Sequence, residues 1–258
     1  MLVRAQLQPP LRRKRELVLQ FPYDLTDLIA LAYFLLLWAG YGHYAKRRAN
    51  SGRQLSLSRA LRRHREAWAE RLLQRDMRMT DASLLANQER VVGFFASTTL
   101  LLMAAVLTAI TTSARIAELS SHIPFTEDQS TEQIEAKLAL LLLILIYAFF
   151  KVTWSLRQYG FAAVVMGGAP NPSEALSIEQ RQMFVDNLAK LMDSAGHDNN
   201  SCLRAYYFAL SVVCWLSGTI PFLAAATITV FVLYNREFGS SAVISIQHSF
   251  ITPDDGNR

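Results

Sequence analysis

The stretch LALLLLILIYAFFKVTWSL, residues 138–156, decides the fold of this chain. Lys151 is its only charged residue, and the rest is almost entirely apolar. A helix needs about 20 such residues, at about 1.5 Å each, to cross a hydrocarbon core of about 30 Å. The stretch therefore predicts a helix that crosses a membrane.

Three further apolar runs have a similar or greater length, at residues 28–45, 91–112 and 205–233. Apolar residues make up 52% of the 258-residue chain, and the mean hydropathy is +0.17. Both values are high for a soluble domain. We therefore expect an all-α, polytopic helical membrane protein with about four transmembrane helices. Pro221 predicts a kink in the last of them.

The distribution of charge predicts the orientation of these spans. Twelve basic residues and five acidic ones lie between the first two spans, whereas the next connection, at residues 113–137, is mostly acidic. Because cytoplasmic loops carry the excess of Lys and Arg, the first loop is predicted to lie inside. Alternation then places both termini outside. An odd number of spans, with the first run lying at the interface, is the alternative.

These assignments divide the chain into a basic N-terminal tail at 1–27, a transmembrane domain at 28–234 and a C-terminal tail at 235–258. Within the transmembrane domain, residues 46–90 and 157–204 are the predicted cytoplasmic loops. The predicted location is the plasma membrane, or the inner membrane of a bacterium.

Each predicted cytoplasmic loop contains an amphipathic helix. In the first, Leu57, Leu61, Trp68, Leu72 and Met79 share one face, and Arg59, Arg62 and Arg63 lie opposite. This helix would either lie on anionic lipid or pack on other cytoplasmic helices.

The second amphipathic helix begins near Ser177, which forms a capping box with Gln180, and is predicted to end at GHDNN, residues 196–200. In the C-terminal tail, apolar residues alternate with smaller ones in SAVISIQHSF, residues 241–250, which predicts a strand.

Lys151 has two interpretations. It lies about 9 Å from the inner end of its span, so its side chain would reach water along the helix. Alternatively it faces a cavity, where no carboxylate from any span would pair with it, and its charge would attract an anion. Arg90, Arg157 and Arg204, near the inner ends of spans, would extend the positive region.

Hydroxyl side chains are the second group of candidate site residues. They include Ser97, Thr98, Thr99 and Thr153. Such residues either bring helices together or line a hydrated path.

No enzyme is indicated by the sequence. The five histidines lie far apart, Cys202 and Cys214 are about 18 Å apart on a helix, and no phosphate-binding glycine loop or nucleophile motif is present. We therefore expect no catalytic residues, no cofactor, no bound metal and no nucleic-acid partner.

Several segments resemble one known family. They are WAGYGHYAKRR at 38–48, RMTDASLLANQERVVGFFASTTLLLMA at 78–104, FKVTWSLRQY at 150–159, LRAYYFALSVVCWL at 203–216 and YNREF at 234–238. Together they resemble the bacterial and plant membrane proteins grouped as domain of unknown function 599, roughly from Asp27 to Ser240. The resemblance implies a multi-span membrane protein and assigns no activity to any residue.

Two hypotheses on function follow. In the first, the protein is a non-enzymatic homo-oligomer that forms a conduit or binding cavity for an anion or small solute, with Lys151 and Arg157 near its inner mouth. In the second, it is a scaffold whose basic cytoplasmic loop binds anionic lipid or a partner complex, which would include another membrane protein, through Arg59, Arg62, Arg63 and Trp68.

Overall fold

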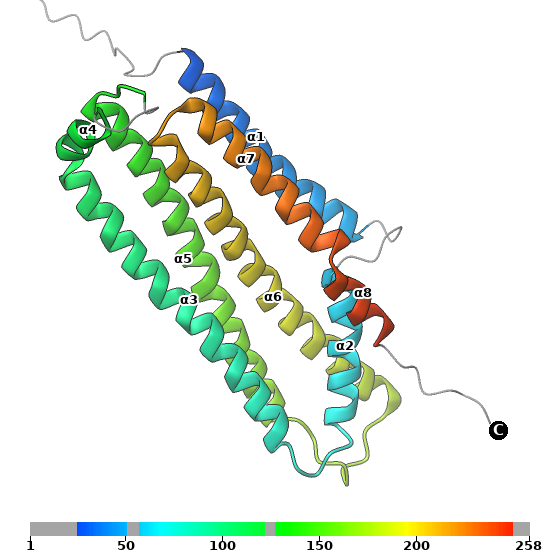
Figure 1. Cartoon of the computed structure of the whole chain (residues 1–258). Helices are drawn as coiled ribbons and strands as arrows, with labels where there is room; N and C mark the ends of the chain where they lie inside the picture. The colour runs from blue at the N-terminus through cyan, green and yellow to red at the C-terminus, as the bar shows by residue number, and fades with distance from the viewer. Residues whose placement is uncertain (1–24, 51–56, 122–126, 250–258) are drawn as a thin grey trace, which may run out of the picture.

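Helices make up all of the regular structure in the computed structural model, which describes residues 25–50, 57–121 and 127–249 (Figure 1). The elements are α1 (Leu25–Asn50), α2 (Leu57–Leu72), α3 (Met79–Thr111), α4 (Ser113–Ser121), α5 (Thr131–Gly167), α6 (Ile178–Trp215), α7 (Thr219–Tyr234), the short π-helix η1 (Asn235–Gly239) and α8 (Ser241–His248). Most of the predicted N-terminal tail, residues 1–24, and the last nine residues lie outside the described residues.

Four stretches of helix among the described residues are long and apolar enough to cross a membrane. They are Leu25–Ala45, Met79–Thr111, Thr131–Gly167 and Thr219–His248. The prediction of an all-α polytopic helical protein is confirmed.

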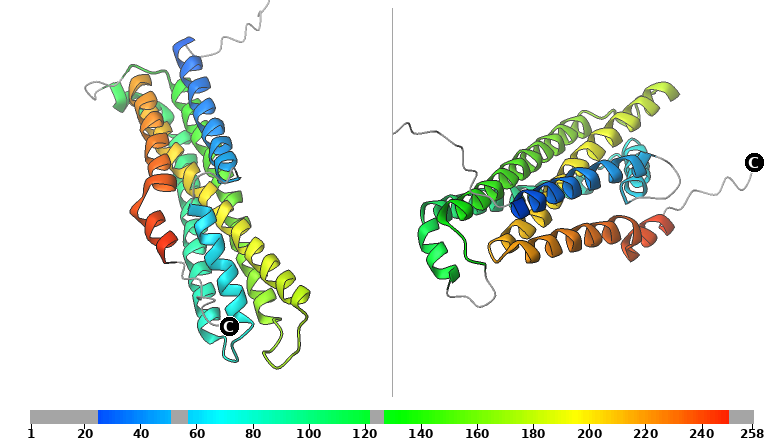
Figure 2. Two further views of the ribbon diagram at one scale, coloured as in Figure 1. Left: turned by 90° about the vertical axis from the view of Figure 1, so that its right-hand side faces the viewer. Right: turned by 90° about the horizontal axis from the view of Figure 1, so that it is seen from above.

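The long helices run side by side and alternate in direction, so the bundle has two distinct ends (Figures 1 and 2). One end carries α4 and the turn between α6 and α7, and we call it the α4 end. The other carries α2, the loop between α5 and α6, and α8, and we call it the α2 end. α1 begins at the α4 end and packs against α7.

The single span predicted over 205–233 is wrong, because these residues form two helices. α6 ends at Trp215 and α7 begins at Thr219. Gly218, at φ 149°, allows this reversal because residues with a Cβ rarely adopt such a backbone. The turn could not be recognised from hydropathy, because the end of α6 and the whole of α7 are both apolar. Pro221 lies in the first turn of α7, where a missing N–H does no harm, and is not in the middle of a span.

This turn changes the predicted placement of the first and last described elements, α1 and α8, whereas both termini of the chain lie outside the described residues. Five helices run along the bundle axis in the described part of the chain: α1, α3, α5, α6 and α7. Leu25 consequently lies at the α4 end and α8 lies at the α2 end (Figure 1). The alternation of four spans had placed both ends of the chain on one side.

α6 is also longer than predicted. It begins as expected, since Ser177 Oγ accepts a hydrogen bond from the Gln180 backbone N–H at 3.1 Å. It does not end at residues 196–200, however, and the prediction of a helix end there is wrong. Gly196 packs closely against Arg65 of α2, where a side chain larger than hydrogen would collide with the guanidinium. Asp198 binds Lys151 and Gln158 of α5.

The predicted strand at 241–250 is likewise wrong over its described residues, which form α8. Ser240 Oγ accepts a hydrogen bond from the Val243 backbone N–H at 3.4 Å and so caps the helix. α8 packs on α2, where a ring nitrogen of His64 lies 2.8 Å from the Ile246 carbonyl oxygen. A single strand would have had no partner, whereas a helix satisfies its own backbone.

α2 packs on α6 and not on a free surface. Its buried residues include Ala60, Ala69 and Leu72, and Arg65 Nη1 lies 2.5 Å from Asp193 Oδ1 of α6. Of the two interpretations of this amphipathic helix, packing on another helix is the one that the structure supports. The bundle therefore has one half containing α1 and α7 and a second half containing α2 and α8, while α3, α5 and α6 run through both (Figure 2).

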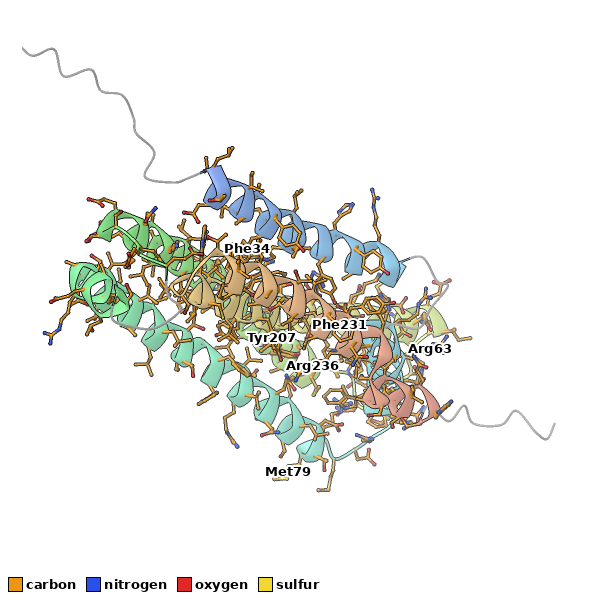
Figure 3. All side chains as sticks on the ribbon, turned by 45° about the horizontal axis from the view of Figure 1, so that its top comes forward. Phe34, Arg63, Met79, Tyr207, Phe231 and Arg236 are labelled. Atoms are coloured by element: carbon orange, nitrogen blue, oxygen red, sulfur yellow. The ribbon has the colours of Figure 1, made fainter. Side chains whose placement is uncertain are left out.

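Aromatic side chains pack where α1, α6 and α7 meet, around Phe34, which is labelled in Figure 3. Phe34 of α1 is fully buried against Phe208 of α6 and Phe222 of α7, with ring centres 5.6 and 5.2 Å away. Trp215 stacks on Phe222 at 4.3 Å. These contacts hold α1, α6 and α7 together where the chain reverses.

Candidate functional site

Lys151 forms an ion pair with Asp198 between α5 and α6. Its Nζ lies 2.8 Å from Asp198 Oδ1, and the lysine side chain is 33% exposed while that of Asp198 is 9% exposed. The prediction that no carboxylate pairs with Lys151 is therefore wrong. The error has a clear origin, because Asp198 lies in the segment that was assigned to a loop.

A buried polar network holds Asp198 in place. Its second oxygen, Oδ2, accepts a hydrogen bond from Gln158 Nε2 at 2.8 Å. Nearby, Ser155 Oγ donates to the Ala195 carbonyl oxygen at 2.7 Å. Gln158 Oε1 is buried and has no hydrogen-bond partner among the described residues. These bonds join α5 to α6 along the same seam that positions Lys151.

Lys151 faces a cavity of about 530 Å³ between α1, α5 and α6, which we call the α1–α5–α6 cavity. Its walls are largely aromatic, since Trp38 packs against Tyr147 and Phe208 with ring centres 5.6 and 5.9 Å away. The lining residues are Leu35, Trp38, Ala39, Tyr41, Gly42, His43, Tyr147, Lys151, His197, Ser201, Arg204 and Phe208.

Arg204 is the second cation of this cavity. Its Nη2 lies 3.8 Å from Glu237 Oε1, and its guanidinium lies 6.0 Å from the centre of the Tyr41 ring. Tyr41 donates its hydroxyl proton to Glu237 Oε2 at 2.8 Å. Glu237 belongs to η1, so this cluster joins α1, α6 and the segment that follows α7.

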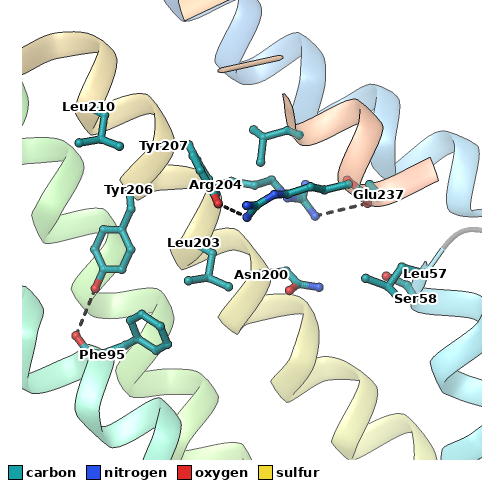
Figure 4. A pocket seen from close by; sticks show the side chains of 12 residues that line it. Leu57, Ser58, Phe95, Asn200, Leu203, Arg204, Tyr206, Tyr207, Leu210 and Glu237 are labelled. Carbon is teal, nitrogen blue, oxygen red and sulfur yellow. Dashed lines mark hydrogen bonds and ion pairs between the residues drawn. The ribbon is translucent and has the colours of Figure 1, made fainter. Parts of the chain in front are cut away.

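A second cavity, of about 570 Å³, lies on the other side of Arg204, and we call it the α3–α6–α7 cavity (Figure 4). Arg236 of η1 donates from Nη1 to the Tyr207 hydroxyl, and Tyr206 donates to the Phe95 carbonyl oxygen at 3.1 Å. The lining residues are Leu57, Ser58, Phe95, Asn200, Leu203, Arg204, Tyr206, Tyr207, Leu210, Leu233, Arg236 and Glu237.

The predicted positive region is only partly assembled. Lys151 and Arg204 line the α1–α5–α6 cavity, but Arg90 and Arg157 do not line either cavity and are exposed. The guanidinium of Arg157 lies over the Phe161 ring, 5.6 Å from its centre.

The predicted hydroxyl residues bond to their own helices and line neither cavity. Ser97, Thr98 and Thr153 donate to backbone carbonyl oxygens four residues earlier, at 3.2, 2.9 and 2.7 Å. Thr99 is fully buried and also hydrogen-bonds to the Tyr206 hydroxyl, which joins α3 to α6. For Thr99, helix packing is thus the role that the contacts support.

Of the four residues of the first loop that were predicted to contact lipid or a partner, Arg62 and Trp68 instead form hydrogen bonds within the protein. Arg62 Nε donates to Glu66 Oε1 at 2.8 Å, and Trp68 Nε1 donates to Asp81 Oδ1 at 2.6 Å. Arg63 is exposed and Arg59 is half-buried.

Sequence reasoning missed Asp198 and Glu237 as members of the site. The spacing of the residues around Asp198 indicated that it lies on the buried face of a helix. Ala195, Asp198 and Cys202 follow one another at intervals of three and four residues, as along one face of a continuous helix. Glu237 had no comparable signal, because only the direction of α7 brings η1 beside α1.

The arrangement can bind a ligand with both charge and apolar surface. Each of the two cations has donors to spare, since an ammonium carries three N–H groups and a guanidinium five. The aromatic walls provide apolar contact, and charged hydrogen bonds strengthen where water is scarce.

A family model described as a protein of unknown function, DUF599, matches residues 29–242. No curated protein and no solved structure matches the chain significantly.

Proposed function

The chain belongs to DUF599, a family of proteins of unknown function, and we propose that it is a membrane protein that binds a small organic anion in the α1–α5–α6 cavity. One observation carries this proposal. Lys151 and Arg204, from different helices, face one cavity whose other walls are mainly aromatic.

The hydrogen-bond donors of Arg204, and not the net charge of the site, support an anion as the ligand. Asp198 and Glu237 offset the two positive charges, so the site would be close to neutral when empty. The Arg204–Glu237 contact, at 3.8 Å, is longer than a hydrogen bond. An anion would therefore be able to take up Arg204 donors without first breaking a tight pair.

Binding is tested with the purified full-length chain and salicylate, a small aromatic carboxylate, as the first probe. Lys151→Met keeps the length of the side chain and removes the charge, and should weaken salicylate binding about tenfold or more. Arg157→Met is the matched control, since Arg157 is on the same helix but outside the cavity, and it should bind as the unchanged protein does. Equal effects of the two substitutions, or no effect of Lys151→Met, would refute the proposal.

Reconstituted vesicles separate a binding protein from a conduit. If the bound anion also crosses the membrane, vesicles with the protein will release salicylate faster than empty vesicles, and Lys151→Met will slow the release. If release equals that of empty vesicles while salicylate still binds, the protein is a binding protein only. The particle mass in the same preparation tests the expected homo-oligomer.

The scaffold hypothesis draws less support from the contacts. Arg62 and Trp68 already form hydrogen bonds within the protein, so of the four residues predicted to contact lipid or a partner only Arg63 and the half-buried Arg59 have no such bond among those given above. We accordingly place anion binding first.

A further inference from the structure

Arg236 is a cation that has no acidic partner in the described part of the chain. Among the described residues, no Asp or Glu oxygen lies within ion-pair distance of its guanidinium. Its Nη1 donates to the neutral hydroxyl of Tyr207, and the guanidinium lies 5.4 Å from the centre of that ring. Arg236 comes two residues after the end of α7, where an apolar stretch gives way to polar residues. Its charge is therefore available to an anion at the edge of the membrane.

The α3–α6–α7 cavity beside Arg236 has a polar side and an apolar side (Figure 4). Arg204, Arg236 and Asn200 supply polar groups, whereas Leu210 and Leu233 supply apolar surface. Two guanidinium groups face a single carboxylate, that of Glu237. With two cations and one anion among its lining residues, the cavity has a net positive charge.

The apolar side of the cavity continues along α6. Phe95 of α3 and Leu233 of α7 form opposite walls, and α6 forms the floor between them. Leu210, which lines this floor, is 62% exposed, and Val213, three residues further along α6, is 45% exposed. The distance along α6 from Leu203 to Val213 is about 15 Å at about 1.5 Å per residue. That length would accommodate much of an acyl chain.

We propose that the α3–α6–α7 cavity binds a phospholipid with a net negative headgroup. The phosphate lies against Arg236 and Arg204, and one acyl chain lies on α6 between α3 and α7. Charge complementarity favours this occupant, because a planar guanidinium binds phosphate oxygens in pairs. The apolar floor that leads away from the two arginines matches the lipid's own change from charge to hydrocarbon.

The test measures binding of phosphatidylglycerol to the full chain by native mass spectrometry from neutral micelles, with phosphatidylcholine as the zwitterionic comparison. Phosphatidylglycerol should bind at least about tenfold more tightly, and Arg236→Ala should remove most of that difference. Arg90→Ala is the matched control, since Arg90 is an exposed arginine outside the cavity. If both alanine variants lose binding equally, attraction is general to the surface and the proposal fails.

Two further arms distinguish a lipid from a free anion. Leu210→Trp fills the apolar floor without changing any charge, and should also weaken phosphatidylglycerol binding. Inorganic phosphate at millimolar concentration should compete poorly. Full competition by phosphate, or unchanged lipid binding by Leu210→Trp, would show a free-anion site and overturn the proposal. Arg236→Lys keeps the charge and should recover part of the affinity if the protein is folded.

The two proposed sites share Arg204, which lines both cavities, but Lys151 and Arg236 each line only one of them and so tell the two proposals apart. Arg236→Ala lies outside the α1–α5–α6 cavity and should leave salicylate binding unchanged. Lys151→Met should in turn leave phosphatidylglycerol binding unchanged, because Lys151 does not line the α3–α6–α7 cavity.

Discussion

The positive charge of Lys151 is stabilised by its ion pair with Asp198 more than by the surrounding solvent. The lysine is one-third exposed, whereas the carboxylate is nearly buried and also binds Gln158. Removing one member of such a pair leaves the other charge poorly solvated. The contact is therefore structural as well as a source of charge for the cavity.

This pair gives a prediction at the scale of single residues. Lys151→Met and Asp198→Asn should each lower the free energy of unfolding, by about 1–3 kcal/mol, because each leaves an uncompensated charge or an unpaired buried group. The double variant should lose less than the sum of the two. Thermal unfolding in detergent measures all three. Strictly additive losses would show that the two side chains do not interact.

Individual residues of the site were only partly predictable. Lys151 was found because a charge inside an apolar run is unusual in any sequence. Its partner was not found, since Asp198 lies in a polar stretch with glycine and asparagine that has the composition of a loop. Whether Asp198 lies in a loop or on a helix face depends on α5, which lies about forty residues away in the sequence and supplies Lys151 and Gln158.

Among the elements, the turn between α6 and α7 has the greatest influence on the topology. Gly218 lies between them, and the Glu127 carboxylate accepts hydrogen bonds from the Thr219 backbone N–H at 3.2 Å. The acidic side chain thus caps the first turn of α7. A Cβ on residue 218 would lie 2.9 Å from Glu127 Cδ.

Gly218→Ala should therefore destabilise the protein by about 1–3 kcal/mol, because it combines a strained backbone with a clash at the cap. Gly40→Ala provides the comparison, since Gly40 is within α1 and a methyl group added there would have no other atom within 4 Å. It should be neutral or slightly stabilising. Melting temperatures of the two variants measure the difference. Similar melting temperatures would contradict the role given to Gly218.

The apolar regions of the chain were predictable from the sequence, but their division into helices and the connections between them were not. Length and hydropathy identified every long apolar segment, because those properties are local. The reversal at Gly218 was missed since a helical hairpin and one long span have the same apolar composition. α8 was misread because alternation over a few residues indicates a strand equally well as one face of a short helix.

At the scale of the whole molecule, the structure predicts that α8 and α2 lie on one side of the membrane and Leu25 on the other. Single cysteines at Leu25, Arg63 and Ser241, in a chain with Cys202 and Cys214 replaced by serine, test this. In intact cells an impermeant thiol reagent should label position 25 and should not label 63 or 241. Labelling of 25 and 241 from the same side would contradict the five-helix path.

The contact between α1 and α7 has a consequence for how the chain is made. Tyr33 and Thr227, whose hydroxyl oxygens are 3.0 Å apart, are separated by 194 positions in the sequence. At about 5–20 residues per second, ribosomes take roughly 10–40 seconds to produce the second after the first. α1 can contact α5 and α6 earlier, through Trp38, Tyr147 and Phe208, but its contact with α7 forms only near the end of translation. Messages cut short before α7 would release products in which Phe34 of α1 lacks the Phe222 ring that packs on it in the full chain.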